Sequence, residues 1–337
     1  MGKVIKVSIP DKGHSTGRGV GYYTEFLKKS LLRLSEVKLT DNDPDIIHYP
    51  FFDPFYHTLP TSFDKPTIVT IHDLTPLVMS DRFPKGVLST ISLFLQWWSV
   101  RKVSAIITDS ENSKRDIEKY FFINPEKIHV TPLAVDPVYS KAPSAKFIQE
   151  VKKKYNLPDR FVLSVPGGPD PNKNIPSLAE VTARLGIPLV AVGSSFLQEV
   201  KHPVPPELLD LVRLGVYKHI ITPGFVPTDE VNAMYHLATL YASTSLYEGF
   251  GLPLLQAMTA GCLFVSSRAS SLPEIYHQEA ITCNPKSLKS MEKAISKALA
   301  LSPIQKQKQI NLAKKKSREF NWEKTAKQTL GVYKSIL

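Results

Sequence analysis

The feature that most constrains this 337-residue chain is an alternation of short apolar runs with amphipathic helical patterns, which occurs twice. In the first half, KVIKVSI, DIIHYPF, PTIVTIH and SAIITDS alternate with helical segments such as YTEFLKKSLLRL and NSKRDIEKYF. The alternation restarts with RFVLSV and continues through IPLVAVG, HIITPG, LATLYAS and CLFVSS. Val- and Ile-rich strands that alternate with helices are typical of parallel sheets covered on both faces. The sequence therefore predicts an α/β protein with two doubly wound units in tandem.

The length of the chain also favours two domains, because one domain usually has about 100–200 residues. We expect the boundary within the charged stretch around QEVKKKYNLPD, so that residues 1–150 form the first domain and the second begins at residue 151. Open parallel sheets bind ligands beyond the carboxyl ends of their strands. Function is therefore expected in a cleft between the two units.

Composition excludes several classes of protein. With 42% hydrophobic and 22% charged residues, the chain is neither disordered nor fibrous. Its two cysteines form no C-x-x-C pair, which argues against a disulfide scaffold or a four-ligand zinc site. The N-terminus lacks the pattern of a secretory signal, and the longest apolar stretch, VLSTISLFLQWW, is too short to cross about 30 Å of hydrocarbon. We expect a cytoplasmic protein.

The formal net charge of +11 is concentrated near the C-terminus, where residues 286–337 contain 13 Lys and Arg but only 3 Asp and Glu. Two interpretations stay open: a solvated helix face, or a surface that contacts an anionic membrane. Nucleic acid is disfavoured because no aromatic platform accompanies the charges. Residues 86–102 combine aromatic and basic side chains, which suits a membrane interface, but a core helix of the first domain is the favoured interpretation.

Glycine-rich and histidine motifs mark the first half. In GRGVGYY, Gly19 and Gly21 open a helix whose N-terminus could hold a phosphate, although a plain turn is the alternative and the spacing is not that of a dinucleotide fingerprint. His72 and Asp73 end the strand-like run PTIVTIH, where an imidazole could bond a substrate hydroxyl or serve a packing role. The sequence contains no H-E-x-x-H motif and its other histidines are scattered, so we expect no metal site.

Two motifs mark the second half. Lys173 lies in the turn PGGPDPNKN, where it could pair a pyrophosphate or simply be exposed. The most specific stretch is STSLYEGFGLPLLQAMTAG, in which Glu248 precedes a glycine-flanked turn and an apolar helix carries Gln256. A carboxylate beside such a turn can accept sugar hydroxyl hydrogen bonds while free N–H groups hold a phosphate. The apolar side chains that we expect to be core and not ligand contacts are Leu254, Leu255 and Met258.

These segments together resemble a known family. EGFGLP, with Ser245 before it and AMTAG after it, looks like the donor-binding signature of glycosyltransferase family 4, the group 1 glycosyl transferases. GVGYY, TIHDLTPL, TDSENSKRDI, PLAVDP, GGPDPNKN, GFVPTDEVNAMY, SSLPEI and the terminal FNW resemble family segments in the same order. The resemblance covers nearly the whole chain. It implies the GT-B fold, with two Rossmann-like domains that face a cleft.

The resemblance also implies roles for domains and residues. Residues 1–150 would be the acceptor side, residues 151–319 the nucleotide-sugar donor domain, and residues 320–337 a helix that packs back toward the first domain. His72, near the anomeric centre, and Glu248, on the donor sugar, would be the catalytic pair. Lys173 would bind the pyrophosphate. The implied donor-binding positions are Gly19, Gly21, Gly168, Lys173, Glu248, Gly249, Phe250, Gly251, Leu252 and Gln256.

Two departures from the family pattern affect these expectations. Gln256 stands where the family usually has a second glutamate, and an amide offers only one accepting oxygen to ribose hydroxyls. Gly168 stands nearest to the position where many members have an arginine that grips the pyrophosphate. Lys173 could carry that charge alone, or Arg268 could replace the arginine.

The function implied is metal-independent, retaining transfer of a hexose, with a lean toward mannose, to a hydroxyl of a glycan or lipid-linked acceptor. The implied co-substrate is a GDP- or UDP-sugar, and no other cofactor is expected. Peripheral contact with an anionic membrane at its cytoplasmic face, and polysaccharide biosynthesis, would follow from a lipid-linked acceptor. The alternative is a non-catalytic relative that binds a nucleotide sugar or a glycan. A nucleic-acid partner is not expected.

Overall fold

The computed structural model describes residues 4–10, 19–83, 86–194 and 209–337. The chain divides into two compact units: unit 1 comprises Met1–Ala134 and Phe320–Leu337, and unit 2 comprises Val135–Glu319. The sequence had suggested a boundary near residue 150, but the chain enters unit 2 at residue 135. The final 18 residues belong to unit 1, the side toward which we expected them to pack.

Unit 1 is built on a six-stranded sheet with the order β2-β1-β3-β4-β5-β6, in which every pair of neighbours is parallel. Its strands are β1 Ile5–Ser8, β2 Val37–Leu39, β3 Ile46–Tyr49, β4 Thr67–Thr70, β5 Ala105–Thr108 and β6 Ile128–Val130. Its helices are α1 Gly19–Leu31, α2 Thr75–Val78, α3 Val87–Lys102, α4 Glu111–Phe121, the short 3-10 helix η1 Pro125–Lys127, and α13 Trp322–Ser335. Strands β4 and β5 are buried along their whole length, as a sheet covered on both faces requires.

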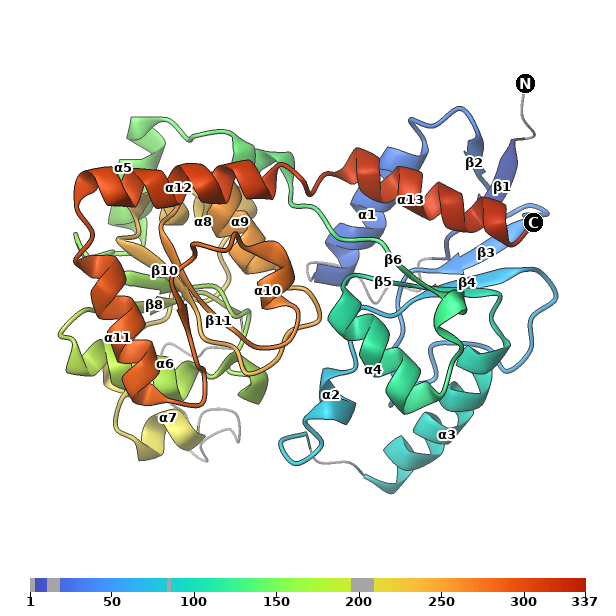
Figure 1. The fold of residues 1–337 in the computed structure, drawn as a ribbon, viewed down its shortest axis with the longest axis horizontal. Helices are drawn as coiled ribbons and strands as arrows, with labels where there is room; N and C mark the ends of the chain where they lie inside the picture. Colours follow the sequence, from blue (N-terminus) through green and yellow to red (C-terminus); the bar gives the residue numbers. More distant parts are fainter. Residues whose placement is uncertain (1–3, 11–18, 84–85, 195–208) are drawn as a thin grey trace. The chain divides into compact units, whose positions relative to one another are not determined.

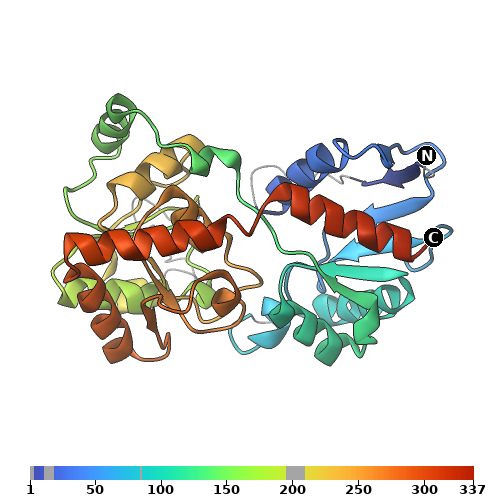
Figure 2. The same ribbon diagram turned by 45° about the horizontal axis from the view of Figure 1, so that its top comes forward.

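The C-terminal helix α13 is fixed in unit 1 by packing and by buried hydrogen bonds. It lies beside α1 (Figures 1 and 2), where Trp322 stacks on Phe26 with ring centroids 5.4 Å apart. Farther along, the Tyr333 hydroxyl lies 2.7 Å from Nδ1 of His48, a fully buried side chain of β3. Nε2 of His48 lies 2.7 Å from the Thr70 hydroxyl on β4. A residue more than 280 positions away therefore completes the hydrogen bonding of the β3 histidine.

Unit 2 has a second six-stranded parallel sheet, with the order β12-β11-β10-β7-β8-β9. Its strands are β7 Val162–Ser164, β8 Leu189–Ala191, β9 Ile220–Ile221, β10 Leu240–Ser243, β11 Phe264–Ser267 and β12 Thr282–Cys283. Its helices are η2 Pro137–Ser140, α5 Ala145–Lys154, η3 Pro171–Lys173, α6 Ile175–Arg184, α7 Leu209–Arg213, η5 Tyr217–His219, α8 Thr228–Leu237, α9 Leu252–Ala260, α10 Leu272–Ile275, α11 Leu288–Leu299 and α12 Pro303–Ser317. Figure 1 shows α12 crossing α9, against which it packs.

The strand order of unit 2 creates a switch point between β7 and β10. From β7 the chain builds outward through β8 and β9, then returns to the other side of β7 with β10 and builds outward again to β12. The loops that leave β7 and β10 therefore diverge to opposite faces of the sheet. Open α/β sheets bind their ligands at such a position, outside the carboxyl ends of the two strands.

The start of unit 2 at residue 135 is explained by the packing of helix η2. Helix η2 packs on α8 and α9, and the Asn232 side chain of α8 donates hydrogen bonds of 2.9 Å to the carbonyls of Val138 and Lys141. Asn232 is buried, so these bonds anchor the connection ahead of α5 firmly to unit 2. A side chain almost a hundred residues downstream thus sets the boundary, which local composition could not indicate.

The strand-like runs named from the sequence all form strands, whereas β2 and β12 were not foreseen. These two edge strands have only three and two residues, so they carry little periodicity. Helix α3 is core on one side, where Gln96 and Val100 are buried, but Phe94 and Trp98 are 62% and 49% exposed. In the described part of the chain, no helix is both long and apolar enough to cross a membrane.

Candidate functional site

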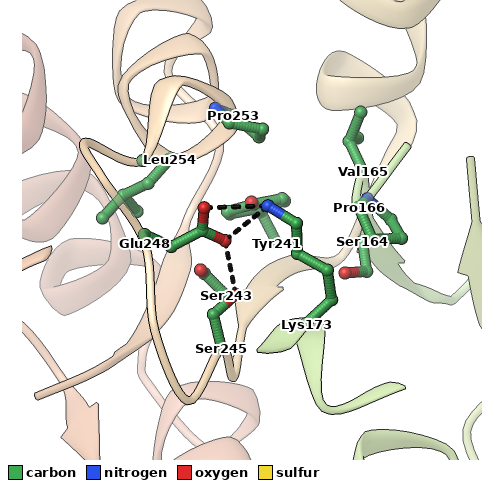
Figure 3. A pocket seen from close by; sticks show the side chains of 11 residues that line it. Ser164, Val165, Pro166, Lys173, Tyr241, Ser243, Ser245, Glu248, Pro253 and Leu254 are labelled. Carbon is green, nitrogen blue, oxygen red and sulfur yellow. Dashed lines mark hydrogen bonds and ion pairs between the residues drawn. The ribbon is translucent and has the colours of Figure 1, made fainter. Parts of the chain in front are cut away.

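A pocket in unit 2 lies at the switch point between β7 and β10 (Figure 3). Its space outside the protein atoms is about 270 Å³, part of which is open to solvent. It is formed by the ends of β7 and β10, the turn η3, and the start of α9. The lining residues are Ser164, Val165, Pro166, Lys173, Tyr241, Ser243, Ser245, Glu248, Gly251, Pro253 and Leu254.

An ion pair dominates this pocket. Nζ of Lys173 lies 2.8 Å from both carboxylate oxygens of Glu248, and Figure 3 shows the lysine reaching across from η3 to the loop that precedes α9. The Ser245 hydroxyl donates a 2.7 Å hydrogen bond to Oε1 of the same carboxylate. The two charged side chains are only 19% and 13% exposed. Charges so placed interact more strongly than exposed pairs, because water screens them less.

The loop that carries Glu248 is held by three serines, one at the end of β11 and two in the segment after it. The backbone N–H of Glu248 donates to the Ser270 hydroxyl at 2.8 Å, and the Ser271 hydroxyl donates to the Glu248 carbonyl at 2.9 Å. The buried Ser267 hydroxyl donates to the Ser245 carbonyl at 2.7 Å. The carboxylate is therefore positioned by hydrogen bonds on both sides of its own peptide unit.

Two asparagines that flank Lys173 tie its turn to the loop that carries Glu248. Nδ2 of Asn172 donates to the Tyr247 carbonyl at 3.0 Å, and the backbone N–H of Leu246 donates to the Asn172 carbonyl at 2.7 Å. Asn174 has a left-handed backbone, with φ at 56°, and its Nδ2 bonds the Thr244 carbonyl at 3.2 Å. Both asparagine side chains are buried. The turn and the loop therefore form one connected structure, and the Lys173–Glu248 geometry follows from it.

The start of α9 is shaped for a close approach to a ligand. Gly251 precedes the helix with φ at 110°, and a Cβ there would lie 2.5 Å from Cδ2 of Leu272. No side chain among the described residues caps the first turn of α9. Free N–H groups and the helix dipole make such an end favourable for an anion. Leu254, Leu255 and Met258 are buried in the core as expected, and Leu254 also lies against the pocket.

Other predicted donor residues lie around the pocket without lining it. Gln256 faces α8, where the buried Tyr235 hydroxyl lies 3.2 Å from its Oε1. Gly168 is buried in the turn after β7, and Arg268 is exposed after β11. Three further predicted residues do not line the pocket: Gly249 and Phe250, which are buried, and Leu252, which begins α9. Their backbone roles toward a donor remain predictions.

In unit 1, His72 follows β4 and lies between two acceptors. Nδ1 lies 2.7 Å from Oδ2 of the buried Asp109, and Nε2 lies 3.2 Å from the Pro50 carbonyl. Burial alone would lower the pKa of His72, but the Asp109 carboxylate raises it above the usual value of 6.5. Because both partners accept hydrogen bonds, the geometry suits a doubly protonated ring. To bond a sugar hydroxyl through Nε2, His72 would have to release Pro50.

The predicted glycines of unit 1 lie at the start of α1. Gly19 is its first residue, with open space where a Cβ would stand, and Gly21 lies in its first turn. Gly17, the first glycine of that motif, lies outside the described residues. Tyr23, two residues farther along α1, packs its ring edge on His72 with centroids 4.7 Å apart. Helix α1 therefore supports the histidine as well as carrying the glycines.

Sequence reasoning missed the residues that position the site. Asn172, Asn174, Ser270 and Ser271 were visible within motifs, but their partners are backbone carbonyls and N–H groups of other loops, which no local pattern reveals. Asp109 stood in the motif TDSENSKRDI without an assigned role. Within the described ranges, no three His, Cys, Asp or Glu side chains gather closely enough to hold a metal ion.

Comparison with known proteins agrees with the resemblance. The family model for group 1 glycosyl transferases matches residues 147–317, and the model for glycosyltransferase family 4 matches residues 7–139. The serotype-specific mannosyltransferase WbdA of Escherichia coli is 28% identical over 310 residues, 86% of this chain and 37% of WbdA. O-antigen chain mannosyltransferase B of Escherichia coli is 25% identical over 97% of this chain and 87% of its own length. The chain spans only 36% to 38% of the length of the three WbdA proteins it matches.

Solved structures show the same fold. The structure of HepE from Anabaena in complex with UDP and glucose superposes with a TM-score of 0.76 at 17% identity, over 98% of this chain and 100% of that one. At this identity the likeness shows the fold alone, and the two parallel six-stranded sheets agree with it. The chain has the GT-B fold and belongs to the group 1 glycosyl transferases.

Proposed function

We propose that the chain transfers a hexose from a nucleoside diphosphate sugar to a hydroxyl of a glycan or lipid-linked acceptor, with retention at the anomeric carbon. The observation that carries this proposal is the meeting of Lys173, Glu248 and the start of α9 in one pocket at the switch point of unit 2. A cation, a carboxylate and a helix N-terminus are the groups that a sugar diphosphate requires. Relatives named as mannosyltransferases, and the HepE complex with UDP and glucose, support this class of donor.

In this proposal, Lys173 and the N–H groups at Gly251 and Leu252 stabilise the diphosphate, whose negative charge grows as the bond to the sugar breaks. Fixed dipoles and charges in a pocket shielded from water need no reorganisation at that moment. Glu248 accepts hydrogen bonds from the sugar hydroxyls and so orients the ring. These groups supply the charge stabilisation without a metal ion.

Retention follows if the acceptor attacks the face from which the diphosphate leaves. A phosphate oxygen then takes the acceptor proton, and no side chain of the enzyme becomes covalently attached to the sugar. Catalysis would come from electrostatic stabilisation and from positioning of the two substrates. His72 would contribute a hydrogen bond to the sugar, and Gly19 and Gly21 would let the backbone of unit 1 approach the donor phosphate.

Mannose is the proposed sugar, because WbdA and O-antigen chain mannosyltransferase B are named for its transfer. The donor would then be a GDP-sugar, with a UDP-sugar as the competing choice. Gln256 is the proposed ribose contact. Its Oε1 accepts a hydrogen bond from Tyr235 and keeps a second lone pair, and its amide nitrogen can donate, so both atoms are available to ribose hydroxyls.

The test is a transfer assay that measures release of the nucleoside diphosphate from GDP-mannose and UDP-glucose in the presence of oligosaccharide acceptors. We expect Glu248→Gln to fold normally and to lose most of the transfer activity. Glu279→Gln is the matched control, because it removes an exposed carboxylate of unit 2 that also pairs with a lysine, Lys308. Full activity of Glu248→Gln would remove this residue from the site.

A non-catalytic relative is the competing function, and the observation that favours it is the amide of Gln256 at the position where the family usually has a glutamate. A protein of that kind would bind the nucleotide sugar without releasing the diphosphate when acceptors are added. Thermal stabilisation by the donor without turnover on any acceptor would therefore support it, since a ligand that binds only the folded state raises stability.

A lipid-linked acceptor would require the enzyme to reach the cytoplasmic face of a membrane, and we propose weak adsorption to anionic lipids. The basic end of helix α12 supports this, where Lys314, Lys315 and Lys316 in the last turn are followed by Arg318. Binding to anionic vesicles should fall as salt rises, because charges are screened beyond about 8 Å at physiological ionic strength. Neutralising these basic residues should reduce binding. Equal affinity for neutral and anionic vesicles would point to a soluble acceptor.

A further inference from the structure

The Lys173–Glu248 ion pair joins the two side chains that would hold opposite ends of a sugar diphosphate. Both oxygens of Glu248 lie 2.8 Å from Nζ of Lys173, so the lysine directs its charge at the carboxylate symmetrically. The pair lies in the pocket itself, and both side chains are largely shielded from water. Any anion that binds Lys173 must therefore compete with a carboxylate of the protein.

The cost of that competition falls on Glu248. When a phosphate oxygen takes the place of a carboxylate oxygen at Nζ, the carboxylate loses a charge-assisted hydrogen bond and gains a negative neighbour. A carboxylate can only accept hydrogen bonds, so it cannot bond the phosphate directly. Ser245 still donates one hydrogen bond to Oε1, which is a neutral donor and replaces only part of the lost interaction.

A sugar attached to the diphosphate would supply what Glu248 loses. Sugar hydroxyls donate hydrogen bonds, and two of them can meet the two oxygens that face the pocket. A nucleoside diphosphate sugar would thus satisfy both Lys173 and Glu248 after the ion pair opens. A nucleoside diphosphate alone would satisfy Lys173 and leave a shielded carboxylate without compensation, which is unfavourable in a pocket of this kind.

We infer that the Lys173–Glu248 ion pair makes the pocket discriminate against a nucleoside diphosphate that lacks its sugar. Glu248 is then a specificity-determining residue that acts by competing for Lys173, in addition to touching the sugar. The same competition favours release of the diphosphate product, because Glu248 regains Lys173 once the sugar has left. The inference rests on the proposed function, since it assigns the diphosphate to Lys173 and the sugar to Glu248.

The test measures the affinities of GDP, GDP-mannose, UDP and UDP-glucose by calorimetry for the wild type and Glu248→Gln. Glutamine has the same size as glutamate, but its amide is neutral and so attracts the lysine ammonium less strongly than the carboxylate does. We expect Glu248→Gln to bind the nucleoside diphosphate about 10-fold more tightly, because a neutral amide holds the lysine less strongly than a carboxylate does. The preference for the sugar-bearing form should fall by at least the same factor. Unchanged or weaker binding of the diphosphate would overturn the inference.

A double-mutant cycle separates competition for the lysine from simple repulsion between Glu248 and phosphate. In the Lys173→Met variant, the Glu248 carboxylate and the phosphate no longer compete for a lysine. Glu248→Gln should then raise diphosphate affinity by much less than it does when Lys173 is present, because only the repulsion between carboxylate and phosphate is removed. A similar gain in both backgrounds would show that Glu248 repels the ligand directly and would overturn the inference.

Glu279→Gln serves again as the control, because it exchanges the same groups in an exposed pair with Lys308 outside the pocket. Its diphosphate affinity should match that of the wild type. If the wild type and Glu248→Gln both bind none of the four nucleotides, the proposed function fails and this inference fails with it. If the wild type binds a nucleotide sugar and Glu248→Gln keeps the same preference for it over the diphosphate, only this inference fails.

Discussion

Acidification should destabilise unit 1 through His48, whose ring is fully buried between Thr70 and Tyr333. Burial, with a smaller contribution from the charge of His72, lowers the pKa of His48 from 6.5 to about 3. The unfolded chain binds a proton at this residue below about pH 6.5, whereas the folded chain does not bind it until about pH 3. Stability is therefore lost as the pH falls through this window. At pH 5 the expected loss, relative to pH 7.5, is about 2 kcal/mol.

The assay uses the positions of the tryptophans. The chain has three, at positions 97, 98 and 322, and all belong to unit 1. Denaturant unfolding followed by tryptophan fluorescence therefore reports on unit 1 separately from unit 2. The wild type and His48→Gln are compared at pH 7.5 and pH 5, because glutamine is polar but does not titrate. The difference between the two proteins removes the effect of other groups, including the opposite effect of His72.

We expect the unfolding free energy of the wild type to fall by about 2 kcal/mol more than that of His48→Gln between these pH values. The variant will be less stable at neutral pH, because it cannot reproduce both hydrogen bonds of the ring, but that loss does not enter the comparison. Equal pH dependence in the two proteins would refute the reasoning. It would mean that His48 is protonated in the folded protein or that α13 separates from the sheet before the histidine titrates.

Three further predictions concern the candidate site. Gly251→Ala should destabilise unit 2 by about 1–3 kcal/mol and weaken donor binding, because φ is left-handed there and the new Cβ would collide with the Leu272 side chain. Gly331→Ala is the control, since its Cβ would meet open space, and it should be neutral or stabilising. Equal melting temperatures for the two variants would contradict this prediction. Asp109→Asn should lower the pKa of His72 below 6.5, since burial would then act without the opposing carboxylate, and an NMR titration in which the pKa stays raised would show that another group is responsible. Gln256→Glu should keep or tighten donor binding by restoring a carboxylate at the ribose; loss of calorimetric binding in a folded variant would assign the residue another role.

The elements of the fold were readable from sequence where a pattern was long enough. Buried strands such as β4 and β5 are continuous apolar runs in the sequence. The apolar stripe of α11 can be seen in the helical spacing of its apolar residues. The two-residue strand β12 has no such pattern and forms because β11 is already in place beside it. The terminal segment that supplies α13 also looked like any basic amphipathic helix. Its membership of unit 1 depends on Tyr333 reaching His48, a contact between distant parts of the sequence.

The candidate site was readable only in part, for a related reason. Lys173 and Glu248 each stood in a recognisable turn, but 75 residues separate them, and no local signal indicated that they pair. The pairing arises because β7 and β10 are neighbours in the sheet. Likewise, His72 was identified by its position at a strand end, whereas the partners that occupy both ring nitrogens come from two other segments. Sequence thus indicates which groups are available, and topology decides which of them meet.

The division of unit 1 into two sequence segments has a consequence for biosynthesis. Unit 2 is one continuous segment, Val135–Glu319, whereas unit 1 lacks α13 until residues 320–337 have been made. Domains usually mature in the order in which the ribosome delivers them. Here the order is inverted: unit 2 can complete its core while the first 134 residues still expose Phe26 on α1 and leave Nδ1 of His48 without its tyrosine partner. A released chain that ends at residue 319 would therefore contain all of unit 2 but an incomplete unit 1, and proteolysis or chaperone capture of such a chain should act on its N-terminal part.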